Sequence, residues 1–253
     1  LATGHWNLQG VEPCKFQFAD PTLFREDQKT DLRAGETMEI IFQDEYIVVC
    51  VKPAGVSSED AGGTGMPALL RRATGVNEIY TVHRLDTAAA GLMVYAKTKA
   101  AAAALSGAVT DGSFHKEYLA AVHGSPAAPA GEYTDLLYKD AKKNKTYVVR
   151  SPRRGVREAR LTYTVLTRAE TRWGPGSLVR IALQTGRTHQ IRVQFASRGT
   201  PLFGDGKYGA KDHCPILTLF SCGIRLPHPA TGELMAFERT PEGEAWEWFL
   251  GKM

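Results

Sequence analysis

Two segments decide the fold of this chain: His83-Arg84-Leu85-Asp86 and, roughly a hundred residues later, Gly186-Arg187-Thr188-His189-Gln190-Ile191-Arg192. The first supplies one carboxylate next to an arginine, and the second is strongly basic. An isolated Asp beside an Arg is usually a surface ion pair that contributes about 0 to 1 kcal/mol, so neither segment is specific alone. Their combination, in this order, is specific.

The two segments resemble the pseudouridine synthases of the RluA branch, whose members carry H-R-L-D, then a Gly-Leu strand and later G-R-T-H-Q-I-R. Further motifs of that family are matched by Val49–Val56, Lys116–Ala120, Gly199–Asp205, Tyr208-Gly209, His228-Pro229 and Thr231–Glu233. The resemblance therefore covers the chain from about residue 39 onward. It implies a catalytic domain over residues 39–253 and an N-terminal extension over residues 1–38, in which no S4-type RNA-binding module is recognisable.

The composition fits a globular protein. With 253 residues, 43% of them hydrophobic, the chain is long enough to bury a large core. Residues 1–6 show no basic stretch followed by an apolar one, and no apolar run approaches the roughly 18 residues of a membrane span. The four cysteines form no C-x-x-C pair and H-E-x-x-H is absent, so no metal site is predicted. We therefore expect a soluble, cytoplasmic protein with reduced thiols.

The formal charge of +4 is unevenly distributed. Residues 139–160 contain nine basic and two acidic residues, so the rest of the chain is acidic. Such a stretch is typical of a surface that binds a polyanion with salt-dependent affinity. Taken alone, a charge run is more often a solvated hairpin. Beside the two motifs it predicts an RNA-binding stretch, in which we expect Lys142, Lys143, Arg153 and Arg154 to contact RNA.

Strand patterns outnumber helical ones along the chain. Apolar and β-branched runs predict strands at residues 39–42, 46–51, 92–96, 116–123, 161–166 and 178–183. Thr98 is expected to cap a helix over residues 99–108, and Thr188 a short helix that runs to Ser197. The Gly-rich residues 61–65 lack the spacing of a phosphate loop and are interpreted as a linker. These elements predict an α+β fold with a largely antiparallel or mixed sheet. The resemblance implies a curved, two-part sheet with flanking helices and a central active-site cleft.

The reaction that the resemblance implies needs a carboxylate and no cofactor. Conversion of uridine into pseudouridine breaks the N1–C1′ bond, turns the uracil within the site and joins C5 to C1′, so that no atom is gained or lost. The resemblance assigns Asp86 as the essential carboxylate, which either attacks C1′ or removes the C2′ proton. It matches Arg192 with the cation that holds Asp86 ionised and oriented, the alternative being a surface or helix-end arginine.

Other motif residues are expected to act on the target nucleotide, which must leave its stack at a cost of a few kcal/mol. Arg84 is expected to fill the vacated space or hold the displaced backbone. Tyr118 is expected to be catalytic, stacking on the uracil or relaying the C5 proton, unless it is an ordinary core tyrosine. Arg187 fits phosphate binding and loop structure equally well. His83 and His189 are interpreted as residues that structure their loops.

The main prediction is an RNA pseudouridine synthase that acts on rRNA or tRNA as a monomer. One alternative is a nucleoside or DNA glycosylase, which would release free base. The other is a non-catalytic RNA-binding module on the same fold, against which the joint presence of Asp86, Arg84, Tyr118 and Arg192 argues. Many family members have Thr-Ser immediately before the Gly-Leu pair, whereas this chain has Ala89-Ala90 and so lacks two hydroxyls there. We therefore expect the turn after Asp86 to lack hydrogen bonds from these positions.

Overall fold

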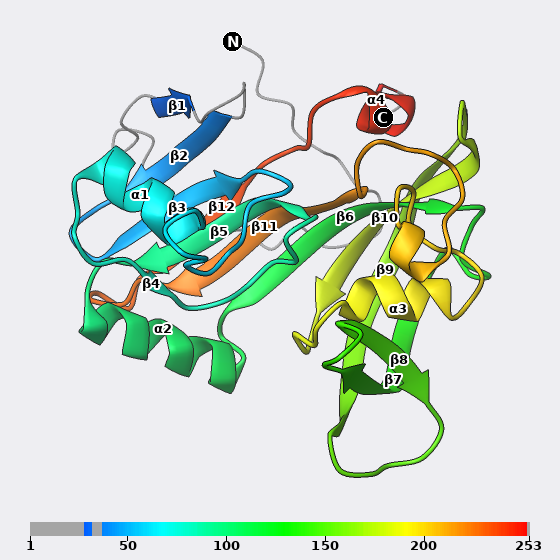
Figure 1. Ribbon diagram of the computed structural model, residues 1–253, viewed down its shortest axis with the longest axis horizontal. Helices are drawn as coiled ribbons and strands as arrows, with labels where there is room; N and C mark the ends of the chain where they lie inside the picture. The colour runs from blue at the N-terminus through cyan, green and yellow to red at the C-terminus, as the bar shows by residue number, and fades with distance from the viewer. Residues whose placement is uncertain (1–27, 32–36, 252–253) are drawn as a thin grey trace.

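A computed structural model describes residues 28–31 and 37–251 of the chain (Figure 1). Its strands are β1 (Gln28–Asp31), β2 (Thr37–Gln43), β3 (Ile47–Lys52), β4 (Tyr80–Thr81), β5 (Ala90–Ala96), β6 (His115–His123), β7 (Ala130–Asp140), β8 (Lys145–Val149), β9 (Val156–Thr171), β10 (Gly174–Leu183), β11 (Leu219–Pro227) and β12 (Leu234–Glu238). Of the predicted extension over residues 1–38, only residues 28–31 and 37–38 are described, and residues 28–31 form the edge strand β1.

The helices are α1 (Met66–Thr74), α2 (Lys99–Asp111), α3 (Gln190–Ala196) and α4 (Glu244–Leu250), with a 3-10 turn at Gly206–Tyr208. As predicted, Thr98 caps α2, because its side chain accepts a hydrogen bond from the backbone N–H of Ala101. No helix among the described residues is long and apolar enough to cross a membrane.

The strands form one mixed sheet, ordered β1-β2-β3-β5-β11-β6-β10-β9-β7-β8, with β12 paired to β11 and β4 to β5. Among the pairs of described strands, β5 with β11 is the parallel one and the others are antiparallel. The predicted α+β fold with a largely antiparallel, mixed sheet is therefore confirmed.

The parallel pair β5–β11 depends on a glycine. Gly91 has a φ of +118°, and a Cβ on it would lie 2.4 Å from the backbone N of Ser221. Since real Cβ atoms do not approach backbone so closely, a glycine is required where the chain enters β5. This close approach holds the start of β5 at the middle of the sheet.

Two helices cover each face of the sheet. On one face α1 and α3 pack on the same core, through Leu70 of the first helix and Phe195 of the second. On the other face α2 inserts Leu105 against β5, and α4 inserts Trp246 and Phe249 against β6. The side chains of β6 alternate between these cores, as expected for a strand buried on both faces.

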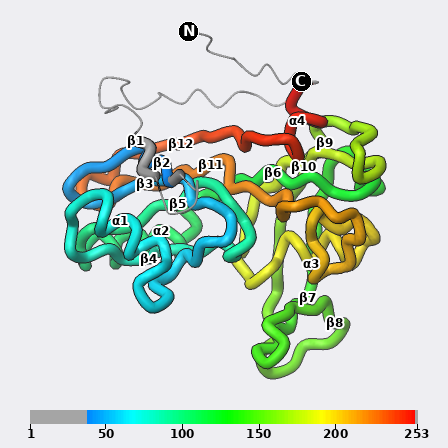
Figure 2. Tube along the Cα trace, turned by 45° about the horizontal axis from the view of Figure 1, so that its top comes forward, coloured from blue at the N-terminus to red at the C-terminus, as the bar shows by residue number. Residues whose placement is uncertain are grey.

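Strands β7 and β8 form a hairpin that extends away from the body of the sheet beneath α3 (Figure 2). The hairpin turn and the segment that leads from β8 into β9 carry the basic stretch predicted from the sequence. Its arginines and most of its lysines are exposed, whereas Lys145 is half-buried.

Two local predictions are wrong. Helix α1 was missed, although Pro67 stands in its first turn and Gly75 ends it in a left-handed conformation. The second error concerns α3, which Thr188 does not cap. The N-cap position belongs to His189, which has a φ of +52° and makes no capping hydrogen bond through its side chain.

Candidate active site

Asp86 lies in the loop between β4 and β5, and Ser58 forms hydrogen bonds with the backbone of that loop. Ser58 Oγ donates to the carbonyl of Leu85 over 2.8 Å and accepts from the backbone N–H of Leu85 over 3.0 Å. Ser58 is buried, and its own carbonyl accepts from the phenol of Tyr95 over 3.0 Å. These bonds fix the backbone of the residue before Asp86, which leaves the carboxylate 19% exposed.

A buried lysine holds the other side of the same loop. The ammonium of Lys52, which has no exposed surface, donates to the carbonyls of Pro53 and Val56 over 2.8 Å and of Thr87 over 3.1 Å. The carbonyl of Thr87 also accepts from the N–H of Gly55 over 2.7 Å. The loop is thus anchored from residues 52–58, without hydroxyls at positions 89 and 90.

Arg192 joins Asp86 to a second carboxylate. Its Nη1 donates to Asp86 Oδ2 over 3.0 Å, as the sequence predicted for this pair. Its Nε and Nη2 donate to the two carboxylate oxygens of Asp205, each over 2.7 Å. The Asp205 side chain has no exposed surface, and that of Arg192 has 8%. Together the two carboxylates raise the pKa of the guanidinium above its ordinary value despite burial, so Arg192 is a permanent cation.

A small pocket of about 90 Å³ opens in front of Asp86. It is lined by residues of the Asp86 loop, β6, the end of β10 and the segment leading into α3 (Arg84, Leu85, Asp86, Ala89, Lys116, Tyr118, Leu183, Gly186, Arg187, His189, Gln190, Ile191, Arg192 and Leu219). The structure therefore brings together the three residues expected to be catalytic and two of the expected RNA-binding arginines.

Tyr118 contributes both to the core and to the pocket. It is 5% exposed and packs with the core cluster that α1 and α3 cover. Burial, with a smaller contribution from the nearby Asp86 carboxylate, raises the pKa of its phenol above the ordinary value. The phenol thus stays protonated at neutral pH and is available as a donor.

Lys116 lines the same pocket and was not predicted as a site residue. Its ammonium lies 5.8 Å from the ring centroid of Phe114, and burial lowers its pKa below the ordinary value. A Cβ on Gly186 would lie 3.5 Å from Lys116 Nζ, so the Gly186 turn lies directly beside the amine. Lys116 therefore adds a cation to the pocket beside Arg84, Arg187 and Arg192.

The two histidines of the motifs occupy different environments. His83 is buried, its Nε2 accepts from the backbone N–H of Val94 over 3.1 Å, and its ring lies 5.0 Å from that of Phe114. It structures the loop as predicted. His189 instead faces the pocket, with Nε2 3.9 Å from Asp86 Oδ2 and Nδ1 2.9 Å from the phenol oxygen of Tyr208.

A wider polar groove of about 460 Å³ adjoins the pocket. It shares Arg84 and Arg187 with the pocket and extends to Lys139 and Asn144, near the end of β7 and in the turn of the β7–β8 hairpin. Arg84 is exposed and pairs with Glu59 over 3.2 Å. The groove thus leads from Asp86 to the basic hairpin.

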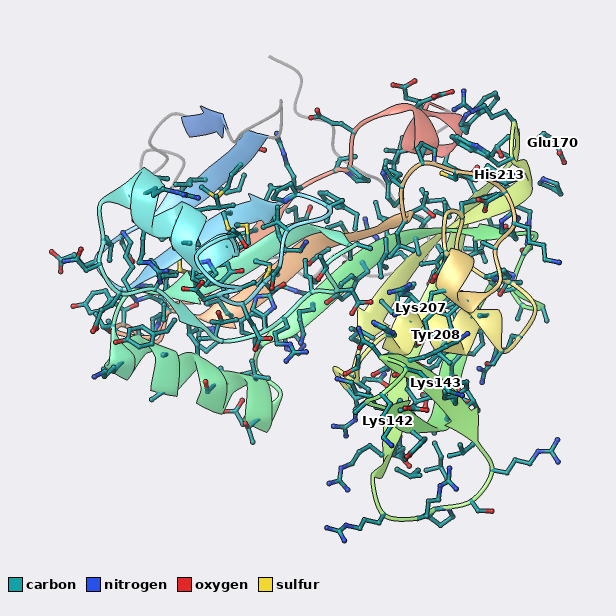
Figure 3. All side chains as sticks on the ribbon, in the orientation of Figure 1. Lys142, Lys143, Glu170, Lys207, Tyr208 and His213 are labelled. Carbon is teal, nitrogen blue, oxygen red and sulfur yellow. The ribbon has the colours of Figure 1, made fainter. Side chains whose placement is uncertain are left out.

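Arg187 lines this groove, whereas the four cations expected to contact RNA in the basic stretch lie outside its lining. The Nε of Arg187 donates to the carbonyl of Glu158 over 2.9 Å, which orders the side chain against β9. Figure 3 shows Lys142 and Lys143 in the turn of the hairpin. Arg153 stacks on Tyr138 with its guanidinium carbon 4.7 Å from the ring centroid. Lys142, Lys143, Arg153 and Arg154 do not line the pocket itself, and all four are exposed.

Five residues that complete the site were not predicted as such: Lys52, Ser58, Lys116, Asp205 and Tyr208. Four of them lie inside motifs that match the family, so their membership of those motifs was the available signal. Ser58 lies outside the motifs, and nothing in the sequence distinguished it from other loop serines. Among the described residues no cluster of His, Cys, Asp and Glu could hold a metal ion.

Comparisons with known proteins identify the family. Residues 46–197 match the family described as RNA pseudouridylate synthase. The ribosomal large subunit pseudouridine synthase D of Zymomonas mobilis is 33% identical over 222 residues, covering 79% of this chain and 68% of that protein. The ribosomal large subunit pseudouridine synthase C of Escherichia coli K12 is 30% identical over 215 residues, covering 79% and 65%.

A solved structure shows the same fold. The human RNA pseudouridylate synthase domain containing 1 superposes with a TM-score of 0.71 at 22% identity, covering 84% of this chain and 86% of that one. The sequence match and the motifs agree with this likeness. The chain therefore belongs to the RNA pseudouridylate synthase family of isomerases, in the RluA branch that its motifs predicted.

Proposed function

We propose that this protein converts specific uridines of large-subunit ribosomal RNA into pseudouridine, with Asp86 as the catalytic carboxylate. The observation that carries the proposal is the placement of Asp86: its loop is fixed on both sides, and Arg192 holds its carboxylate at the pocket. The names of the two bacterial relatives support ribosomal RNA as the substrate. The alternative substrate is tRNA, and the experiment therefore compares the two RNAs.

The geometry supports a division of labour at the target nucleotide. Asp86 supplies the carboxylate that either attacks C1′ or takes the C2′ proton, and Arg192 keeps that carboxylate charged. Breakage of the N1–C1′ bond places negative charge on the uracil, which Lys116 is positioned to offset as a pocket cation. After C5 has joined C1′, C5 must lose its proton and N1 must gain one. Tyr118, which lines the pocket and is protonated, can relay this proton by giving up its own as its phenol oxygen accepts the proton from C5.

The same geometry supports extrusion of the target base from its stack. The pocket is small and adjoins the wider polar groove, so a strand held in the groove can deliver a nucleotide into it. Arg84, exposed where pocket and groove meet, is placed to occupy the space that the base leaves. The exposed cations of the β7–β8 hairpin supply phosphate contacts beyond the groove.

The test is pseudouridine mapping on unmodified large-subunit rRNA and on unmodified tRNA, each incubated with the wild-type chain or with Asp86→Asn. We expect new pseudouridine in the rRNA with the wild type and none with Asp86→Asn, while RNA affinity changes little. Asp111→Asn, at the exposed end of α2, is the matched control and should retain activity. Near-normal turnover by Asp86→Asn would refute the assignment, and release of free uracil would indicate a glycosylase.

A further inference from the structure

A series of hydrogen bonds runs from strand β8 to His189, whose ring lies beside Asp86. The backbone N–H of Thr146, in β8, donates to the phenol oxygen of Tyr208 over 2.9 Å. Thr146 Oγ1 donates to the carbonyl of Thr188 over 2.9 Å. The phenol oxygen of Tyr208 lies 2.9 Å from His189 Nδ1, and His189 Nε2 lies 3.9 Å from Asp86 Oδ2. None of these contacts was used in the proposed mechanism.

The donors and acceptors in this series of hydrogen bonds indicate where the protons lie. A backbone N–H only donates, so Tyr208 accepts from Thr146 and keeps its own hydroxyl hydrogen to donate to His189 Nδ1. At the other side of the ring, Nε2 faces Asp86, which is an acceptor. The neutral tautomer with its hydrogen on Nε2 is the one that gives both ring nitrogens a complementary partner. The amide of Thr146 and the carboxylate of Asp86 together favour this arrangement of protons.

The surroundings of His189 favour its neutral form. The charged groups that face the ring are two carboxylates and two cations: Asp86, Asp205, Arg192 and Lys207. Burial is the main cause that lowers the pKa of the imidazole, and the two cations reinforce it against the carboxylates. The pKa of the Tyr208 phenol is raised, again mainly by burial. Both partners thus hold their protons as the hydrogen bonds require at neutral pH.

The same residues touch the basic hairpin. Lys145, next to Thr146 in β8, has its ammonium 5.2 Å from the centroid of the Tyr208 ring. Lys207 donates to the carbonyl of Asn144 in the hairpin turn over 2.9 Å. In Figure 3 Tyr208 and Lys207 are seen above the turn that carries the labelled hairpin lysines. The hairpin therefore contributes to the position of Tyr208, together with Arg192, whose guanidinium carbon lies 5.1 Å from the centroid of the Tyr208 ring.

We propose that Tyr208 and His189 are positioning residues: Tyr208 fixes the imidazole so that its Nε2–H is presented to Asp86, and Thr146 ties this arrangement to the hairpin. The proposal rests on the proposed function, since the hairpin is taken to bind the RNA. Binding of RNA along the hairpin then orders the donor beside the catalytic carboxylate. The distance of 3.9 Å between His189 Nε2 and Asp86 Oδ2 is too long for a direct hydrogen bond. In the proposal, a shift of β8 on RNA binding shortens this distance.

The first test is Tyr208→Phe, which keeps the ring and removes the hydroxyl. Single-turnover rates at saturating enzyme should fall roughly three- to tenfold, as expected for one lost hydrogen bond, with unchanged RNA affinity. The loss should be smaller at pH 6 than at pH 8, because His189 Nδ1 without its donor takes up a proton more readily, and the protonated ring always carries a hydrogen on Nε2. The matched control is Tyr46→Phe: this exposed tyrosine lies outside the hairpin and the pocket, with its ring 5.6 Å from that of His228, and its variant should leave the rates unchanged.

A double-mutant cycle tests whether the two residues act together. His189→Asn tolerates the positive φ and removes Nε2, so it should slow the reaction at least as much as Tyr208→Phe. The double variant should be no slower than His189→Asn alone. Additive losses, or rates equal to the wild type in Tyr208→Phe, would overturn the proposal.

A third readout does not depend on substrate. NMR of the ¹⁵N-labelled imidazole, assigned by its disappearance in His189→Asn, should show the neutral Nε2–H tautomer in the wild type and in Tyr46→Phe at pH 7. Tyr208→Phe should give a mixture of tautomers. A wild-type ring that carries its hydrogen on Nδ1, or that is a cation at pH 7, would contradict the proposal even if no RNA is modified. Failure of the proposed function alone would instead leave this spectrum as expected.

Discussion

Arg192 binds Asp205 through two hydrogen bonds of 2.7 Å, whereas a single bond of 3.0 Å joins it to Asp86. Asp205 is therefore the residue that orients the guanidinium, and Asp86 receives a cation that is already in place. The side chain of Asp205 is fully covered and that of Asp86 is partly exposed, so the stronger pair lies on the protein side of the site. The weaker contact leaves Asp86 able to move toward a bound nucleotide.

We predict that Asp205→Asn destabilises the fold and slows the reaction. Removal of one partner from a buried ion pair costs about 3 to 5 kcal/mol, and the lower value is expected because Asp86 still faces Arg192. Urea denaturation of the chain measures this loss. Asp135→Asn is the control, since Asp135 also binds an arginine, Arg198, through two hydrogen bonds but at a more exposed position. Equal losses in the two variants would contradict the anchoring role of Asp205.

Arg192→Met should damage catalysis more than Arg187→Met. Loss of a preorganised charged donor at a reacting group typically lowers the rate by a factor on the order of a hundred or more, and only Arg192 contacts Asp86. Arg187, which donates to the carbonyl of Glu158, should affect RNA affinity or the order of its loop. Single-turnover rates at saturating enzyme decide between them, with circular dichroism to confirm folding. Wild-type rates in Arg192→Met would mean that another group holds Asp86.

Neutralising the hairpin should reduce the salt dependence of RNA binding. If Lys142, Lys143, Arg153 and Arg154 each contact a phosphate, their replacement by Ala removes four contacts. Each lost contact to single-stranded RNA lowers the slope of log affinity against log salt by about 0.7, so the slope should fall by about 3. The measurement is a filter-binding titration at several salt concentrations.

The control for the hairpin replaces two exposed cations of the other half of the sheet, in helices α1 and α2, by Ala: Arg72 and Lys99. That variant loses two positive charges and keeps the hairpin intact. Its slope of log affinity against log salt should equal the wild-type value. An unchanged slope in the quadruple variant would show that the hairpin is only a solvated surface.

His83 should make the fold sensitive to acid. Burial lowers its pKa from 6.5 to about 3, with a smaller contribution from Lys116. The unfolded chain therefore binds a proton that the folded chain excludes, and stability is lost as the pH falls from about 6.5 toward 3. The contribution approaches about 1.4 kcal/mol per pH unit within this window.

The pH dependence is measured by urea denaturation of the wild type, His83→Gln and His115→Gln between pH 7 and pH 4. His83→Gln should be less stable at pH 7 but should lose less stability on acidification. His115, exposed at the start of β6, is the control and its variant should follow the wild type. Parallel curves for all three proteins would show that His83 does not exclude the proton.

The sequence was sufficient to predict six of the described strands and two helices: β2, β3, β5, β6, β9, β10, α2 and α3. The remaining described strands and the helices α1 and α4 were not predicted. Residues 46–51 and 92–96 are continuous apolar runs because β3 and β5 are buried on both faces, and Thr98 is a strong capping residue. The contact between Asp86 and Arg192 was predicted from the family resemblance, since no periodicity connects residues 106 positions apart.

The rest depends on contacts between distant segments. The bonds of Asp205, Lys116 and Tyr208 become visible only when β6, the Asp86 loop and the segments around α3 lie together. The positive φ of His189 has no signal in the sequence either, because few residues other than glycine adopt it and a threonine stood one position earlier. Local propensity therefore placed the start of α3 on the wrong residue.

The anchoring of the Asp86 loop also determines where this enzyme can change. Lys52 and Ser58 hold its first half, and the glycine at position 91 holds its exit, so the stretch from residue 87 to 90 is fixed through backbone and through neighbours. Thr87 and Ala88 are exposed. Substitutions at these two positions are free to diversify without displacing the carboxylate. A library built there would vary the wall of the polar groove, which Thr87 lines, without removing the hydrogen bonds that hold the loop.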